Sequence, residues 1–329
     1  MPLGLSLGLP FRMRLRERAL RLLRKAPAAG DIAGSLGWID DFFRQARDHI
    51  FAREEDGVVI LPPNQVYKAN ATGIAIVRHL LAGGKVASIP GISTEERARQ
   101  VAGFVSDIRA LYLGSPADDG RAPYESIPYT FQYTRLPILG EIAVTYRCNN
   151  SCVFCYAGCG GHATGCGGAG PTGTPRSVTG GDGREMSLDE VKRVIGIFKE
   201  EARIPFFSFT GGEPLLRGDL EQMIVHARRI GLQVNLITNA TLADRRRARS
   251  LFTAGLRTAQ VSIESPDAGT HDTLTACPGS HAATIAGLRC LQEAGISVQT
   301  NTTVTAVNAA DGPRLAHSAS LRWPRHEQR

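Results

Sequence analysis

The stretch EIAVTYRCNNSCVFCY (residues 141–156) decides the fold, because an apolar, strand-like run at 141–146 leads directly into three closely spaced cysteines. Cys148, Cys152 and Cys155 form a Cys-x3-Cys-x2-Cys pattern. Three thiols leave one unpaired in any disulfide scheme, but three thiolates can hold three irons of a cubane cluster and leave the fourth iron open. An iron with an open position can act chemically on a bound ligand.

The bulk composition limits the class of protein. The chain has 329 residues, of which 43% are hydrophobic, so it can build the core of one large domain or two. Five of the seven cysteines fall between Cys148 and Cys166, and no secretory signal precedes them. This clustering is typical of metal binding in a reducing compartment, so we expect a cytoplasmic protein. No apolar run reaches the roughly 18 residues of a transmembrane helix, and the arginines at 12–25 do not alternate with aromatic residues, which argues against nucleic-acid binding.

Changes in composition divide the chain into five segments. The predicted segments are a basic helical leader at 1–53, a compact unit at 54–115, a proline- and tyrosine-rich linker at 116–137, a catalytic unit at 138–310 and an irregular tail at 311–329. The regular pattern stops near Asn308, which suggests a truncated or frame-shifted chain whose barrel lacks its last strand.

The compact unit combines a hairpin with two helices. Two β-rich runs, which start at Gly57 and Gln65, flank a turn and predict the hairpin. Asn70 can cap the first helix, and a second helix is predicted from Thr94 to Leu113. Strands and helices at this size predict a winged helix-turn-helix-like α+β domain.

The catalytic unit alternates strands with helices. Glycines follow three of the helices, at Gly231, Gly255 and Gly295, as expected of C-caps. The predicted strands are 141–146, 206–210, 233–238, 258–264 and 297–304. Such alternation predicts an α/β fold with a parallel sheet, curled into a partial barrel of about five strands out of six.

Polar motifs follow the strands at the end where such barrels carry their working residues. Gly211, Gly212 and Glu213 follow the second strand, Asn239 follows the third, Ser262 ends the fourth and Asn301 lies on the fifth. The two glycines would let the backbone approach a ligand closely, and Glu213 would accept a charge-assisted hydrogen bond.

With Phe154 before the last cysteine, the loop resembles the signature of the radical S-adenosylmethionine (SAM) enzymes, and the resemblance covers about residues 138–310. It implies a 4Fe-4S cluster on Cys148, Cys152 and Cys155, with SAM on the open iron. Reductive cleavage of SAM then gives a 5′-deoxyadenosyl radical that abstracts hydrogen from the substrate. The family would place the Tyr156 backbone at the adenine and Glu213 at the methionine ammonium. It assigns no catalytic residue here.

The further cofactor contacts that we expect are Asn239, Ser262 and Asn301, although these residues could equally serve only to satisfy strand ends. Residues 54–115 resemble the peptide-chaperone domain of pyrroloquinoline quinone biosynthesis, which binds a leader peptide as an added strand. That resemblance implies a radical SAM enzyme that cross-links or oxidises a ribosomally made precursor peptide. Its partners would be the peptide and an electron donor such as flavodoxin or ferredoxin.

Other interpretations remain open. Cys159 could complete a four-cysteine zinc site. Cys159 and Cys166 could instead bind an auxiliary iron–sulfur cluster, form a redox pair or lie in a loop over the active site. The substrate could be a small molecule, such as a haem or metal-cofactor precursor. The chain could also be an inactive, truncated peptide-binding protein.

Overall fold

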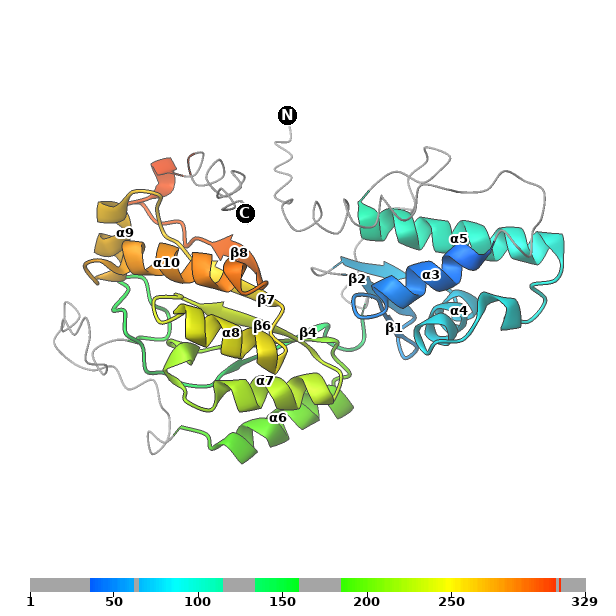
Figure 1. The fold of residues 1–329 in the computed structure, drawn as a ribbon, viewed down its shortest axis with the longest axis horizontal. Coiled ribbons are helices and arrows are strands. Elements are labelled where there is room, and N and C mark those ends of the chain that lie inside the picture. Colours follow the sequence, from blue (N-terminus) through cyan, green and yellow to red (C-terminus); the bar gives the residue numbers. More distant parts are fainter. Residues whose placement is uncertain (1–35, 62–64, 115–133, 160–184, 312–313, 315–329) are drawn as a thin grey trace. The chain divides into compact units, whose positions relative to one another are not determined.

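The computed structural model describes residues 36–61, 65–114, 134–159, 185–311 and 314. These residues form two separately packed units, one up to Ile138 and one from Leu139 onward (Figure 1). Within the described ranges, none of the helices combines the length and the apolar character that crossing a bilayer requires.

The first unit is a three-stranded antiparallel sheet with helices. Its elements are α3 (Gly37–Ala46), β1 (Phe51–Arg53), β2 (Val58–Leu61), β3 (Gln65–Lys68), α4 (Ala71–Leu81), η1 (Val86–Ser88) and α5 (Glu95–Leu113). The sheet order is β1-β2-β3, and all four residues of β2 are buried. The predicted hairpin is confirmed by the antiparallel pairing of β2 with β3. Asn70 caps α4 as predicted, and Thr94 caps α5; each side chain accepts a backbone N–H of the first turn.

This first unit begins earlier than the sequence suggested. Helix α3 and strand β1 lie within the predicted leader at 1–53, yet Ile39, Phe42 and Phe43 are buried in the core of the unit. Their spacing of three and four residues is that of one helix face, and charged residues between them masked it. Residues 1–35 of the predicted leader lie outside the described residues.

A buried ion pair holds the end of the predicted linker to this unit. Arg53 donates to both carboxylate oxygens of Asp56, at 2.9 and 2.8 Å, and the two side chains are only 5% and 0% exposed. The same guanidinium donates to the carbonyls of Leu136 (2.8 Å) and Pro137 (2.6 Å). The chain therefore leaves the small unit at Pro137, two residues before the first barrel strand at Leu139.

The second unit is a parallel sheet with helical crossovers. Its elements are β4 (Leu139–Ala143), α6 (Leu188–Glu200), β5 (Phe206–Thr210), η2 (Pro214–Leu216), α7 (Leu220–Arg229), β6 (Gln233–Thr238), α8 (Arg245–Ala254), β7 (Thr258–Ser262), α9 (Ala268–Thr275), α10 (Ser280–Glu293), β8 (Ser297–Asn301) and η3 (Ala309–Asp311). All neighbours in the order β4-β5-β6-β7-β8 are parallel. Sequential parallel strands with right-handed crossovers place the helices on one side and curl the sheet into part of a barrel. The predicted α/β partial barrel is confirmed.

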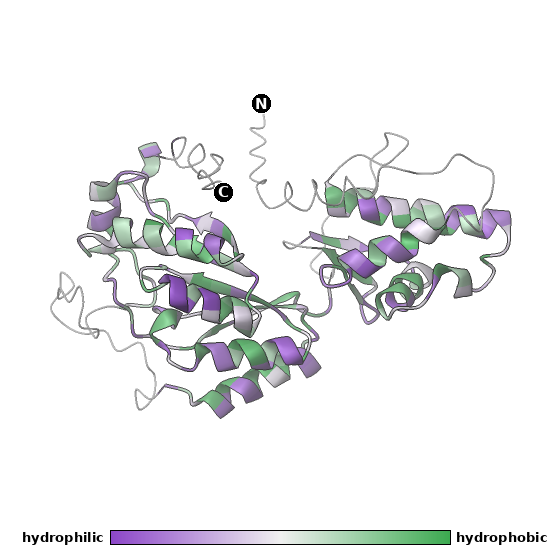
Figure 2. Cartoon of the chain, viewed as in Figure 1, coloured by the Kyte–Doolittle hydropathy of each residue, from purple (hydrophilic) through white to green (hydrophobic). Residues whose placement is uncertain are grey.

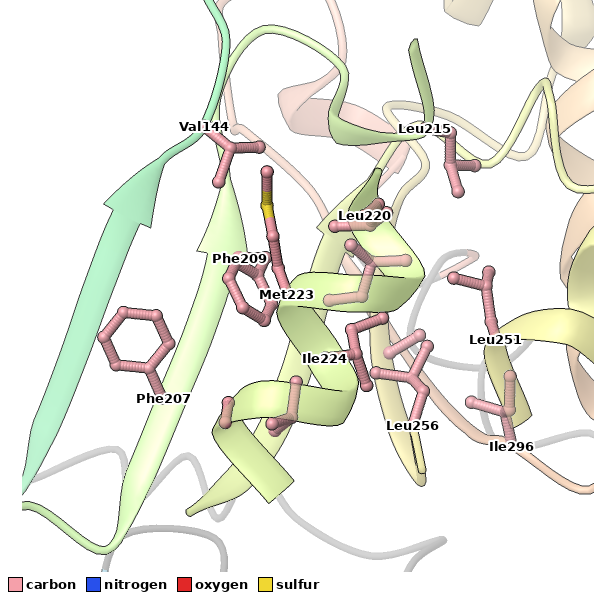
Figure 3. Close-up of a cluster of buried hydrophobic side chains, with 14 of the residues drawn as sticks. Val144, Phe207, Phe209, Leu215, Leu220, Met223, Ile224, Leu251, Leu256 and Ile296 are labelled. Carbon is pink, nitrogen blue, oxygen red and sulfur yellow. The ribbon is translucent and has the colours of Figure 1, made fainter. Parts of the chain in front are cut away.

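One face of this sheet carries the core. Figure 3 shows Phe207 and Phe209 of β5 with Met223 and Ile224 of α7, and all four side chains are fully buried. Hydrophilic and hydrophobic residues mix along α6, α7 and α8, as expected of helices that bury one side (Figure 2). The alternate residues of the strands are largely polar: Asn235, for example, donates to Ser208 across the β5–β6 register. The face opposite the helices is therefore a polar interior.

The last two strands end earlier than predicted. β7 stops at Ser262 because the N–H of Glu264 donates to Nδ1 of His271 (3.1 Å) instead of to a strand. β8 stops at Asn301, and the N–H of Thr303 donates to the Glu264 carboxylate (2.9 Å). Side chains thus replace the ladder bonds at the strand ends, where the site is expected.

We expect Arg53→Met to destabilise the first unit by about 3–5 kcal/mol, because it leaves the Asp56 carboxylate buried without its partner. The matched control is Arg99→Met: Arg99 pairs with Glu95, but these side chains are 72% and 68% exposed, so the cost should stay below about 0.5 kcal/mol. Denaturant titrations of the three proteins measure both effects. If both variants lose the same free energy of unfolding, burial does not make the Arg53–Asp56 pair more important than the exposed one.

Candidate functional site

The three predicted cluster ligands lie in one loop directly after β4, which we call the cysteine loop (residues 148–155). They are free, half-buried thiols: Cys148, Cys152 and Cys155. The backbone N–H groups of Ser151 and Val153 donate to the last carbonyls of α9, each at 2.9 Å. Main-chain hydrogen bonds to α9 therefore hold the cysteine loop in place.

The thiols have unequal acidities. Burial raises the pKa of Cys148 to about 11. Burial, together with the charges of Cys148 and Glu264, raises the pKa of Cys152 to about 12. A hydrogen bond with the Cys159 thiol lowers the pKa of Cys155 to about 6. Because iron binds thiolates, loading a cluster must release the protons that burial keeps on Cys148 and Cys152.

The zinc alternative would add Cys159 to the three cysteines of the loop and is not tested by the structure. Among the described residues, no three His, Cys, Asp or Glu side chains converge closely enough to hold a single metal ion. A tetrahedral zinc needs its ligands within about 2.3 Å of one centre, whereas each thiolate of a cubane binds its own iron. Cys159 is buried beside Cys155. Cys166 lies outside the described residues, so the auxiliary cluster stays a prediction.

The Gly211–Glu213 turn packs against the backbone that enters the cysteine loop. The N–H of Gly212 donates to the Thr145 carbonyl, and that of Glu213 to the Arg147 carbonyl, each at 2.8 Å. A Cβ on Gly211 would lie 2.2 Å from the oxygen of Thr145, and one on Gly212 would lie 2.3 Å from that of Arg147. Both glycines are thus required by the neighbouring strand end, a reason different from the ligand approach that the sequence suggested.

Glu213 is fully buried beneath this turn. Its Oε1 accepts from the N–H of Leu215 (2.9 Å) and the hydroxyl of Thr238 (2.7 Å), and its Oε2 accepts from the N–H of Asn239 (2.8 Å). Burial nevertheless raises the pKa of Glu213 to about 7, against these three bonds. A carboxylate has about four acceptor positions, so one is left for the predicted ammonium contact.

The structure brings some of the other predicted residues together. Ser262 and Asn301 are direct partners in the β7–β8 register, at the same edge of the sheet as the cysteine loop. Asn239 touches Glu213, and its side chain bonds to other protein groups. Tyr156, just after the loop, is 92% exposed. Contacts of these four residues with a cofactor stay predictions.

Sequence reasoning missed Glu264, which lies two residues beyond β7. Its side chain is buried, burial raises the pKa of its carboxyl group, and its charge acts on Cys152. A lone acidic residue that continues an alternating apolar strand was the available signal. Its neighbour His271 is buried as well, and burial lowers the pKa of this imidazole to about 4, so the ring is neutral at pH 7.

The residues fit a cluster and SAM. Two buried polar atoms of this region, Asn150 Oδ1 and His271 Nε2, have no hydrogen-bond partner in the described part of the chain, which is a common sign of a group that binds there. Cys148, Cys152 and Cys155 would hold the cluster. The Gly-Gly-Glu turn beside the loop would take the amino-acid end of SAM.

Gly212→Ala should destabilise the second unit by about 1–3 kcal/mol, because its Cβ would collide with the Arg147 backbone. Gly218→Ala is the matched control: no atom lies within 4 Å of that Cβ, so its effect should stay within about 0.5 kcal/mol. Free energies of unfolding and iron content after reconstitution measure the difference. If Gly212→Ala matches Gly218→Ala in both, the close packing does not matter.

Glu213 should make stability depend on pH. Because the folded-state pKa of about 7 lies above the ordinary 4.5, the folded protein binds this proton more tightly than the unfolded chain does. The free energy of unfolding that this tighter proton binding contributes has its full value below pH 4.5 and is lost as the pH rises through 7. Relative to Glu213→Gln, the wild type should lose about 3 kcal/mol of unfolding free energy over this window, measured on the apo protein. If the difference in unfolding free energy between the two proteins does not change with pH, the pKa of Glu213 is not raised.

Comparisons with known proteins agree with this geometry. The model of the Radical SAM superfamily matches residues 142–311, just over half of the chain. An AdoMet-dependent heme synthase of Nitratidesulfovibrio vulgaris is 37% identical over 124 residues, which are 38% of this chain and 34% of that protein. A PqqA peptide cyclase of Rhodopseudomonas palustris is 32% identical over 168 residues, or 50% of this chain and 39% of the cyclase. The chain thus spans under half the length of these relatives.

The fold has counterparts among solved structures. Streptococcus suis SuiB bound to S-adenosylmethionine superposes with a TM-score of 0.52 at 17% identity, over 82% of this chain and 58% of SuiB. At this identity the likeness shows the fold alone. The cysteine loop, the Gly-Gly-Glu turn and the family match lead to one conclusion: the chain belongs to the radical SAM superfamily, whose members use a 4Fe-4S cluster and S-adenosylmethionine.

Proposed function

We propose that this protein uses its cluster and SAM to modify a ribosomally made precursor peptide, by cross-linking or oxidation, and that the first unit binds the peptide's leader. The observation that carries the proposal is a separately packed unit with an antiparallel sheet ahead of the barrel. The likeness to SuiB covers 82% of the chain, more than the second unit alone can account for. The similarity to a PqqA peptide cyclase supports a peptide as the substrate.

The chain's own residues divide the work. Cys148, Cys152 and Cys155 hold the cluster, which when loaded supplies one-electron cleavage of SAM to a carbon-centred radical. The Gly211–Glu213 turn orients SAM, because its backbone is fixed against Thr145 and Arg147. The polar interior of the partial barrel receives the part of the peptide that reacts, and Glu264 brings a buried carboxyl group to that interior.

A haem or metal-cofactor precursor is the second candidate substrate. The specific observation in its favour is the 37% identity to an AdoMet-dependent heme synthase. An AdoMet-dependent heme synthase of Methanosarcina barkeri is 35% identical over 53% of this chain, about the share that the peptide cyclase matches. The peptide is preferred because of the separately packed first unit with its antiparallel sheet, and not because of the extent of either similarity.

The test is an anaerobic reconstitution of the full chain with iron, sulfide, SAM and a chemical reductant. Separate reactions contain the precursor peptide encoded beside its gene, the same peptide without its leader, or a haem precursor. We expect 5′-deoxyadenosine in each reaction, and a peptide product lighter by a pair of hydrogen atoms only when the leader is present. A Cys148→Ala/Cys152→Ala/Cys155→Ala variant should form neither product.

Two outcomes contradict the proposal. Conversion of the haem precursor with an unchanged peptide would favour the second candidate. Tight binding of the peptide by a chain that takes up no iron would instead identify the inactive binding protein.

A further inference from the structure

Asn149, the residue after Cys148, ties the cysteine loop to the loop that follows β6. Its Nδ2 donates to the hydroxyl of Thr241 at 2.7 Å, and its Oδ1 accepts from Nδ2 of Asn239 at 2.9 Å. The Thr241 hydroxyl in turn donates to Oδ1 of Asn239 at 2.8 Å. The three side chains form a closed ring of hydrogen bonds, which we call the Asn149 ring. Bonds in such a ring polarise and strengthen one another.

The far side of the ring is fixed by other parts of the barrel. The N–H of Asn239 donates to Oε2 of Glu213, and its carbonyl accepts from the hydroxyl of Thr284 on α10. Ala240 lies between Asn239 and Thr241. Its φ is +59°, a backbone conformation that residues other than glycine rarely adopt. Such strain persists only where surrounding contacts enforce it, and it concentrates at functional sites.

The ring thus continues a chain of hydrogen bonds from Glu213 to the residue beside Cys148. On its other side, the cysteine loop is held through main-chain bonds from Ser151 and Val153 to α9. These bonds lie beyond Cys148 in the sequence. The ring therefore supports the start of the loop, at the end nearest the Gly-Gly-Glu turn.

We propose that Asn149 is a positioning residue that keeps Cys148, and with it the cluster, in register with Glu213 and therefore with the amino-acid end of SAM. The side chain of Asn239 also belongs to this ring, so Asn239 acts through Asn149 rather than by touching SAM. The inference rests on the family's cofactors and not on the identity of the substrate. The proposal about Asn149 can fail while the peptide proposal stands, and the peptide proposal can fail while the one about Asn149 stands.

The test uses Asn149→Ala, Thr241→Val and the double variant, with Thr241→Ser as the matched control because serine keeps the hydroxyl. In the apo protein, the rate at which iodoacetamide alkylates Cys148 is followed by mass spectrometry. In the reconstituted protein, 5′-deoxyadenosine formation without any peptide gives KM for SAM and kcat separately. Iron content and melting temperature are measured on every variant.

Losing the ring should raise the KM for SAM about tenfold with kcat within about twofold, and should speed Cys148 alkylation at least about threefold. The double variant should match Asn149→Ala, because that substitution alone already removes both bonds of Asn149 to the ring, including the one to Thr241. Thr241→Ser should match the wild type. Loss of iron together with faster alkylation also supports the proposal, since the misplaced loop then fails to assemble the cluster.

Other results overturn it. A lower melting temperature with unchanged alkylation and KM would mean that the ring only stabilises the fold. If the fold-changes in KM and in alkylation rate of the two single variants multiply in the double variant, Asn149 and Thr241 act separately. Loss of iron with unchanged alkylation would place the role of Asn149 outside loop positioning.

Discussion

The site depends on how closely two strand ends approach each other. Beyond β4 and β5 the backbones stay paired through Gly212 to Thr145 and Glu213 to Arg147, with no room for a Cβ on either glycine. This contact fixes where the chain enters the cysteine loop. It also forces the Glu213 carboxylate inward, where Leu215, Thr238 and Asn239 satisfy it. Ligand-binding geometry is thus built from main-chain packing, with side chains added to it.

Regular elements of the barrel could be predicted because local chemistry specifies them. β5 and β6 begin and end at the predicted residues, since glycines with positive φ mark boundaries: Gly211 follows β5, and Gly231 lies between α7 and β6. The leader was predicted to be helical, but the packing of α3 into the first unit was missed because acidic and basic residues interrupt its short apolar face. The ends of β7 and β8 were misplaced because side chains replace their ladder bonds: His271 accepts the N–H of Glu264, and the Glu264 carboxylate accepts that of Thr303, 39 residues later.

The candidate site divides in the same way. The three cysteines and the Gly-Gly-Glu turn could be found from the sequence, since their spacing is set by the cofactor they would bind. Glu264 and Asn149 could not, because only the fold brings the charge of Glu264 near enough to act on Cys152 and places Asn149 in hydrogen-bonding contact with Asn239. Asn239 was found from its strand-end position, and the fold adds that its side chain bonds to Asn149 of the cysteine loop.

The central claim is that the cysteine loop holds a cluster with one open iron next to the Gly-Gly-Glu turn. Electron paramagnetic resonance of the reduced, reconstituted protein tests it directly when spectra are recorded before and after SAM is added. The account predicts the signal of a reduced 4Fe-4S cluster, and a change in its g-values when SAM binds the open iron. A cluster signal that SAM leaves unchanged would contradict the account.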